Sequence, residues 1–243
     1  MYGFVLWGLP PVVGQVALPT WEQVLVRGYL RVGVKDNLPA LALRSPTGEI
    51  EGLEIDIARE LAQELLGDRN AVRLVVLSNS ERLNAFDRVD IVIAQVAITN
   101  NRSRLVDFSP PYYTDGTILI AKQGQTLNQL RGILVLKGST AIAHLQQHYP
   151  NLPTIGIDSY PAGITALQTL PNLAMAGDRS VLLPWLQANP EYQQLGGQLS
   201  FHSLGIVMPK GLASAELRQR VRQAMQKWRQ NGWLTNLAQK WGL

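Results

Sequence analysis

Short apolar runs that alternate with amphipathic helical stripes are the feature that most constrains the fold. Residues 29–34 (YLRVGV) and 72–77 predict strands, and residues 90–98 (DIVIAQVAI) predict a third strand that is buried on both faces. Between the first two strands, apolar residues recur at the spacing of one helix face and stop at Gly67, a residue type typical of a helix C-cap. Residues 81–86 predict a short further helix. Alternating strands and helices are typical of an α/β unit around a parallel sheet.

A second unit of the same kind follows residue 113. Its predicted strands, in chain order, are residues 117–121, 133–136, 155–157 and 173–176. Residues 204–208 then predict one more strand, and a long helix follows. Its apolar stripe consists of Leu217, Val221, Ala224, Met225 and Trp228, and Trp233, Leu237 and Trp241 continue the spacing. We interpret these tryptophans as core packing rather than a ligand platform.

Composition excludes several classes of protein. The chain is 46% hydrophobic and 16% charged over 243 residues, which is enough to build a sizeable core. Its net charge of +4 comes from scattered basic residues, so no dense cationic face for nucleic acid is expected. There is no cysteine, which excludes disulfides, thiolate metal sites and a cysteine-linked lipid anchor.

The longest apolar stretch covers residues 1–19. Three prolines make it a poor membrane-spanning helix. Its length and the small residues Gly14 and Ala17 favour an export signal, although the usual positively charged start is missing. A mis-set start or an ordered first strand are the alternatives.

The sequence lacks the common catalytic motifs. It contains no GxSxG, HExxH, P-loop or GxGxxG pattern. His144 and His148 are four residues apart on a predicted helix, but no third ligand follows nearby, so no metal site is expected. We therefore predict a protein that is not an enzyme and that carries no cofactor.

Two charged residues follow buried strands. Arg102 comes just after Thr99 at the end of the third strand, and Asp178 follows the strand of residues 173–176. The carboxyl ends of parallel strands are where such sheets bind ligands. A guanidinium group suits a carboxylate, and an aspartate suits an ammonium group, so a zwitterion satisfies both.

The turn Gly138-Ser139-Thr140 is a weaker candidate. It directly follows the strand of residues 133–136 and opens a helix, where backbone N–H groups and hydroxyls can bind an anion. Serine and threonine also cap helices without any ligand, so the residues alone leave both interpretations open.

Beyond these features, the chain resembles a known family, the amino-acid-binding proteins of ABC importers (type II periplasmic binding proteins, extracellular solute-binding family 3). The resemblance runs from residue 21 to residue 243. The segments that carry it are LRVGVKDNLPAL, GEIEGLEIDIARELAQELLG, RLNAFDRVDIVIAQVAITNNRSRLVDFSPPYY, LKGSTAIAHL and GWLTNLAQKWGL.

The resemblance implies a two-lobed periplasmic-binding-protein fold of the α/β class. Each lobe would be a mostly parallel sheet flanked by helices, and two hinge strands would join the lobes. Lobe 1 is expected at residues 20–113 plus 204–243, and lobe 2 at residues 114–203. The implied function is capture of an amino acid or a similar small zwitterion in the interlobe cleft by hinge closure. The protein would be a periplasmic monomer that serves the membrane permease of an ABC importer.

The resemblance also assigns roles to residues. Arg102 would bind the ligand α-carboxylate with help from Gln95, Ala97 and Thr99, and Asp178 would bind the α-ammonium. In the second lobe, Gly138, Ser139 and Thr140 would add contacts to the carboxylate.

The opening loop departs from the family pattern. Many members carry an aromatic residue there that packs on the ligand, whereas this chain has Leu38. Lys35, beside Asp36, stands where an acidic or polar residue is common. We hypothesise that Lys35 faces the ligand side chain and favours an acidic or amide group. A solvated surface lysine is the alternative.

Two other functions fit the same resemblance. The fold also hosts periplasmic enzymes of the dehydratase type, which would need an acid or base that no residue besides Asp178 offers. It also serves as the sensing domain of signalling receptors, which would leave the lobes unchanged.

Overall fold

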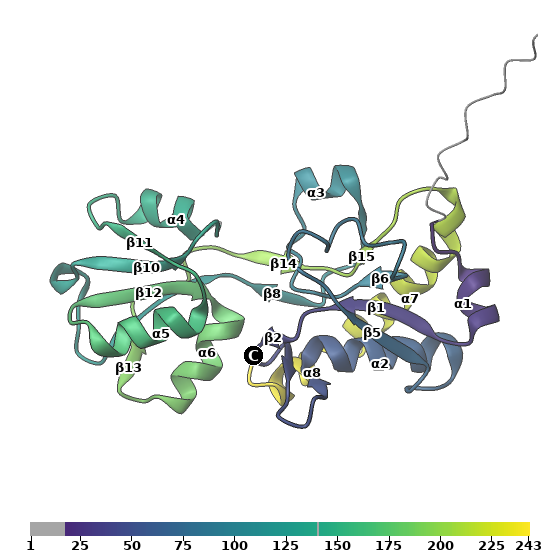
Figure 1. Cartoon of the computed structure of the whole chain (residues 1–243), viewed down its shortest axis with the longest axis horizontal. Helices are drawn as coiled ribbons and strands as arrows, with labels where there is room; N and C mark the ends of the chain where they lie inside the picture. Colours follow the sequence, from purple (N-terminus) through teal and green to yellow (C-terminus); the bar gives the residue numbers. More distant parts are fainter. Residues whose placement is uncertain (1–17, 140) are drawn as a thin grey trace, which may run out of the picture.

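The computed structural model describes residues 18–139 and 141–243. They form two lobes, each built on a five-stranded sheet, and a two-stranded ribbon connects the lobes (Figure 1). The structure confirms the expected two-lobed α/β fold. Residues 1–17 of the expected export signal, and Thr140, lie outside the described residues.

The sheet of the first lobe is mostly parallel. Its strands, in spatial order, are β5 (Val72–Val76), β1 (Leu30–Val34), β6 (Ile91–Val92), β15 (Val207–Met208) and β7 (Asp107–Phe108). β1 runs parallel to β5 and β6, whereas β15 is antiparallel to β6 and β7. A small separate sheet is formed by β2 (Asn37–Leu38), β3 (Ala42–Arg44) and β4 (Ile50–Glu51).

The helices of the first lobe cover its sheet. They are α1 (Trp21–Arg27), α2 (Leu53–Leu66), α3 (Asn100–Leu105), α7 (Ala215–Gln230) and α8 (Trp233–Lys240). α2 ends as predicted at Gly67, which has a left-handed φ of 79°. The predicted apolar stripe of α7 is entirely buried. Trp228 lies in this core while Trp233 and Trp241 pack against it, which confirms that the tryptophans serve packing.

The second lobe repeats the same strand arrangement. Its strands, in spatial order, are β11 (Thr154–Ile157), β10 (Gly132–Leu136), β12 (Leu173–Asp178), β9 (Thr117–Lys122) and β13 (Tyr192–Gln194). β10 is parallel to β11 and β12, and β9 is antiparallel to both its neighbours. The accompanying helices are α4 (Ala141–His148), α5 (Tyr160–Thr169) and α6 (Arg179–Ala188), and short 3₁₀ turns occur at η1 (Leu127–Gln129) and, in the first lobe, at η2 (Leu212–Ser214).

Two antiparallel strands form the hinge. β8 (Tyr113–Asp115) pairs with β14 (His202–Leu204), and Thr114 lies opposite Ser203 (Figure 1). The expected lobe boundaries, between residues 113 and 114 and between 203 and 204, fall inside these two strands.

Three predicted elements were wrong. The long strand expected over residues 90–98 is reduced to β6, because Gln95 takes a left-handed φ of 50° that a strand does not allow. The single strand expected over 204–208 is split between β14 in the hinge and β15 in the first-lobe sheet, with Gly205 between them. Residues 81–86 form turns instead of a helix.

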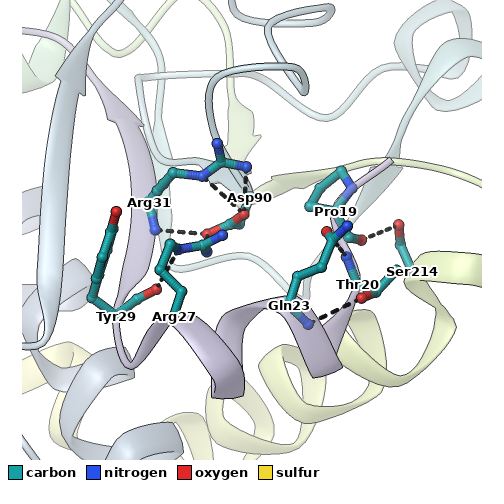
Figure 2. Close-up of polar contacts among 8 residues, drawn as sticks. All are labelled: Pro19, Thr20, Gln23, Arg27, Tyr29, Arg31, Asp90 and Ser214. Carbon is teal, nitrogen blue, oxygen red and sulfur yellow. Dashed lines mark hydrogen bonds and ion pairs between the residues drawn. The ribbon is translucent and has the colours of Figure 1, made fainter. Parts of the chain in front are cut away.

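The start of the described chain is fixed to the first lobe by polar contacts (Figure 2). The Ser214 hydroxyl donates to the Pro19 carbonyl at 2.6 Å, and Thr20 caps α1. Behind α1, the fully buried Asp90 accepts from the Arg31 backbone N–H at 2.7 Å and forms ion pairs with Arg27 and Arg31. Such pairing compensates the cost of burying a carboxylate.

Among the helices of the described residues, none has the length and apolar character needed to cross a membrane.

Candidate functional site

The carboxyl ends of the parallel strands in both sheets lie beside the hinge. β9 continues from β8, and its first residue, Thr117, pairs with Asp178 at the end of β12. β15 follows β14, and Val207 pairs with Val92 at the end of β6. β6 and β12 therefore end near the hinge from opposite sides (Figure 1), and the residues that follow these two strands start at the hinge side of each lobe.

Arg102 is held against the segment that follows β6. Thr99 is the N-cap of α3 and accepts from the Arg102 backbone N–H at 3.3 Å. The guanidinium Nη1 of Arg102 donates to the Ala97 carbonyl at 3.0 Å. Within the described chain, no carboxylate forms an ion pair with Arg102. Partial burial lowers the pKa of Arg102, so an incoming anion would stabilise its charged form.

Gln95 connects the two lobes. Its backbone N–H donates to Glu54 Oε1 at 2.7 Å in the first lobe. Its side-chain Nε2 lies 3.4 Å from Asp178 Oδ2 and 3.3 Å from Ser180 Oγ in the second lobe. Ala97 forms an isolated β-bridge with Leu204 of the hinge strand.

Asp178 is the last residue of β12 and precedes α6. The Tyr160 hydroxyl donates to its carboxylate at 2.9 Å. Burial raises the pKa of Asp178, and the negative charge of nearby Asp115 raises it further. A cationic group at this carboxylate would favour its ionised form.

Asp115 and His202 complete a cluster around Asp178. One carboxylate oxygen of each aspartate and one imidazole nitrogen of His202 lie within 4.8 Å of one another. Asp115 is fully buried and accepts from the backbone N–H of Gly116 at 2.8 Å and of Ser180 at 3.0 Å. These bonds give Asp115 a structural role that joins β8 to the start of α6. His148, by contrast, has its ring Nδ1 2.9 Å from the His144 carbonyl in α4.

The Gly-Ser turn lies on the same edge of the second-lobe sheet as Asp178, because β10 and β12 are parallel neighbours. Gly138 has a left-handed φ of 71°, and the Ser139 hydroxyl accepts from the Ala141 backbone N–H at 3.1 Å. Ser139 thus accepts a hydrogen bond from the first residue of α4. The predicted ligand contact of Thr140 lies outside the described residues.

The three predicted ligand-binding residues of the opening loop, Lys35, Asp36 and Leu38, lie in different environments. Lys35 follows β1 directly, and its ammonium donates to the Leu77 carbonyl at 3.2 Å, at the end of β5. Asp36 forms an ion pair with Arg44 at 3.1 Å, and Leu38 is buried in the first-lobe core. Lys35 therefore differs from the other two residues. Its charged group lies at the carboxyl edge of the sheet and forms no ion pair within the described residues.

Sequence reasoning missed Arg82. Its Nη1 donates to the carbonyls of Ala94 at 2.9 Å and Gln95 at 3.0 Å, directly after β6. The predicted helix over residues 81–86 gave no reason to place this side chain at the sheet edge. Its position between two predicted strand ends was the only signal that pointed to it.

Sequence reasoning also missed Glu54. This residue is fully buried in the first turn of α2, where its Oε1 accepts from the Tyr112 hydroxyl and the Gln95 N–H. Its other oxygen has no hydrogen-bond partner among the described residues. Burial raises the pKa of Glu54 to about 7. An acidic residue between the apolar Leu53 and Ile55 was the available signal.

Comparisons with known proteins agree with this architecture. The model of the bacterial extracellular solute-binding proteins, family 3, matches residues 30–243. The chain is 31% identical to a glutamine-binding protein of Geobacillus stearothermophilus over 77% of this chain and 75% of that protein. It is 27% identical to an ABC transporter glutamine-binding protein of Bacillus subtilis over 86% and 79% of the two chains. A solute receptor for L-cysteine of Neisseria gonorrhoeae superposes with a TM-score of 0.76 at 25% identity, covering 91% and 93% of the two chains.

Proposed function

The chain belongs to the bacterial extracellular solute-binding proteins of family 3, and from this premise we propose that it captures an amino acid between its lobes for an ABC-type importer. Its relatives are solute-binding proteins, so binding rather than turnover is the activity. A periplasmic location, a monomeric state and a partner permease belong to the same proposal.

The proposal rests on the positions of Arg102 and Asp178. Arg102 follows a strand of the first lobe and Asp178 ends a strand of the second, so a guanidinium and a carboxylate lie on opposite sides of the interlobe space. Gln95, in the segment between β6 and Arg102, contacts Asp178 of the other lobe through its side-chain amide. A zwitterion with its carboxylate on Arg102 and its ammonium on Asp178 satisfies both charges.

Other residues would support this placement. The Ser139 turn lies on the same strand edge as Asp178, and we propose that its backbone, together with Gly138 and Thr140, contacts the ligand carboxylate on closure. Thr99 would hold the Arg102 backbone and Ala97 would hold its guanidinium group in position.

Closure would follow from the hinge. Within residues 18–139 and 141–243 the chain passes between the lobes through β8 and β14, so small backbone changes in these two strands can rotate one lobe toward the other. We propose that the ligand docks first on the Arg102 side and that the second lobe then adds Asp178. A ligand that contacts both lobes stabilises the closed state by its differential affinity.

Substitution of Arg102 tests the proposal. Purified protein is titrated calorimetrically with the amino acid that gives the largest thermal stabilisation in a screen of the standard amino acids. Arg102→Ala is expected to weaken binding by about 2–5 kcal/mol, because a buried carboxylate loses its charge-assisted partner.

Arg104→Ala provides the matched control, since Arg104 is an exposed residue of the same short helix. It is expected to bind like the unmodified protein. Unchanged affinity in Arg102→Ala would remove Arg102 from the site, and a screen in which no amino acid stabilises the protein would contradict the proposed function itself.

A further inference from the structure

Three basic side chains gather at the carboxyl edge of the first-lobe sheet. Lys35 follows β1, Arg82 reaches the carbonyls that follow β6, and Arg102 reaches the Ala97 carbonyl. All three donate to backbone carbonyls. In the described part of the chain, none of the three forms an ion pair with a carboxylate.

These cations lie close enough to repel one another. Besides burial, the charge of Arg82 lowers the pKa of Lys35, and the charge of Arg102 lowers the pKa of Arg82. Like charges kept together in a partly buried site raise the free energy of the unliganded protein. An anion that enters between them relieves this repulsion.

The nearby carboxylates are already engaged elsewhere. Glu54 is buried and accepts hydrogen bonds from Tyr112 and Gln95. Glu81 accepts from Ser78 and pairs with Arg88. Asp178 belongs to the other lobe and accepts from Tyr160. The carboxyl edge of the first-lobe sheet therefore carries more positive charge than the α-carboxylate of one bound ligand neutralises.

We propose that Lys35 and Arg82 form a second cationic site, separate from Arg102, that binds the side-chain carboxylate of an acidic amino acid. This inference rests on the proposed function, and it names the substrate class. Arg102 and Asp178 would bind the two α-groups common to all amino acids. Lys35 and Arg82 would select among side chains, because a closed site of fixed charge discriminates strongly between charged ligands.

Arg82 also has a structural role, since it donates to the carbonyls of Ala94 and Gln95 and thereby supports the left-handed Gln95. The two roles differ in their consequences. Loss of support for Gln95 would weaken the binding of every amino acid by a similar factor. Loss of a side-chain carboxylate partner would weaken acidic ligands alone.

The experiment compares ligands that differ in one group. The full-length protein is titrated with L-glutamate, L-aspartate, L-glutamine and L-arginine, and the ratio of the glutamine to the glutamate Kd is the readout. We expect an acidic amino acid to bind tightest and L-arginine to bind weakest. Lys35→Met and Arg82→Gln are each expected to reduce the preference for glutamate over glutamine by about 10- to 100-fold, as for loss of a hydrogen bond to a charged group.

Two further variants provide a control and a reversal of charge. Arg88→Gln removes an exposed arginine of the same loop and is expected to leave the ratio unchanged. Lys35→Glu introduces a negative charge at the same position and is expected to favour L-arginine over L-glutamate. Lys35 is the less embedded of the two residues, so it tests the inference even if Arg82→Gln does not fold.

These measurements test acidic specificity and amino-acid binding separately. A protein that binds L-glutamine or L-arginine tightest would overturn the acidic specificity and leave amino-acid binding intact. An unchanged ratio in both Lys35→Met and Arg82→Gln would do the same. A protein that binds none of the four ligands, nor any other amino acid, would contradict the proposed function.

Discussion

Replacing Glu54 by glutamine is expected to remove a pH dependence from the stability of this protein. Glu54 is completely buried, and burial raises its pKa from the ordinary 4.5 to about 7. Within that interval the folded protein keeps the proton while the unfolded chain has lost it. Stability therefore falls as the pH rises from about 4.5 to about 7 and is constant above that range.

The magnitude follows from the same interval. At about 1.4 kcal/mol for each pH unit, the rise from 4.5 to about 7 corresponds to a loss of about 3 kcal/mol. A glutamine keeps an acceptor for the Tyr112 hydroxyl and the Gln95 N–H. Its amide nitrogen would stand where the unpaired Oε2 is now, at a cost that does not change with pH.

Urea denaturation across this pH range measures the effect. The difference in unfolding free energy between Glu54→Gln and the unmodified protein is expected to shift in favour of the variant by about 3 kcal/mol from the acidic to the neutral end. The exposed Glu49→Gln serves as the control and is expected to follow the unmodified protein. If Glu54→Gln retained the full slope, burial of Glu54 would not be its source.

Two shorter predictions concern the ligand site and the core. The affinity for an amino acid should fall as the pH drops into the raised titration range of Asp178, since only the ionised carboxylate attracts an ammonium group; calorimetry on Asp178→Asn should show weaker binding without that contribution to the pH dependence. Trp228→Ala should destabilise the first lobe by about 3–5 kcal/mol in chemical denaturation, because Trp228 is buried in the core. Leu212→Ala, at a residue that is 94% exposed, is the control for the core variant.

Helices α2, α4 and α7 and most strands were predictable because their patterns are local. The apolar spacing of α2 and the left-handed glycine at its end both follow from residues within the helix and its cap. The strand over residues 90–98 was not predictable, although its apolar residues are indeed largely buried. Its pairing ends early because Gln95 turns its N–H toward Glu54, which is 41 residues away in the sequence. Composition of a segment does not encode such a contact.

The candidate site also contains residues that the sequence indicated and residues that it did not. Arg102 and Asp178 were found because each directly follows a recognisable strand, and strand ends mark the ligand edge of a parallel sheet. Arg82 lies in a loop, and its guanidinium reaches that edge only through tertiary contacts with the carbonyls after β6. Lys35 was singled out because it departs from the family pattern of the opening loop, but its partial burial and the repulsion from Arg82 required the structure.

The location of the site follows from topology before any side chain is considered. Each sheet has a single antiparallel strand between two parallel neighbours, β15 in the first lobe and β9 in the second, and each of these strands starts from the hinge. A strand that leaves the hinge forces its antiparallel neighbours to end there. The carboxyl edges of both sheets must then face the same interlobe space, whichever residues occupy them. The side chains decide the chemistry of the ligand. Here they place on one edge three cations that form no ion pair among the described residues, and on the other edge a carboxylate.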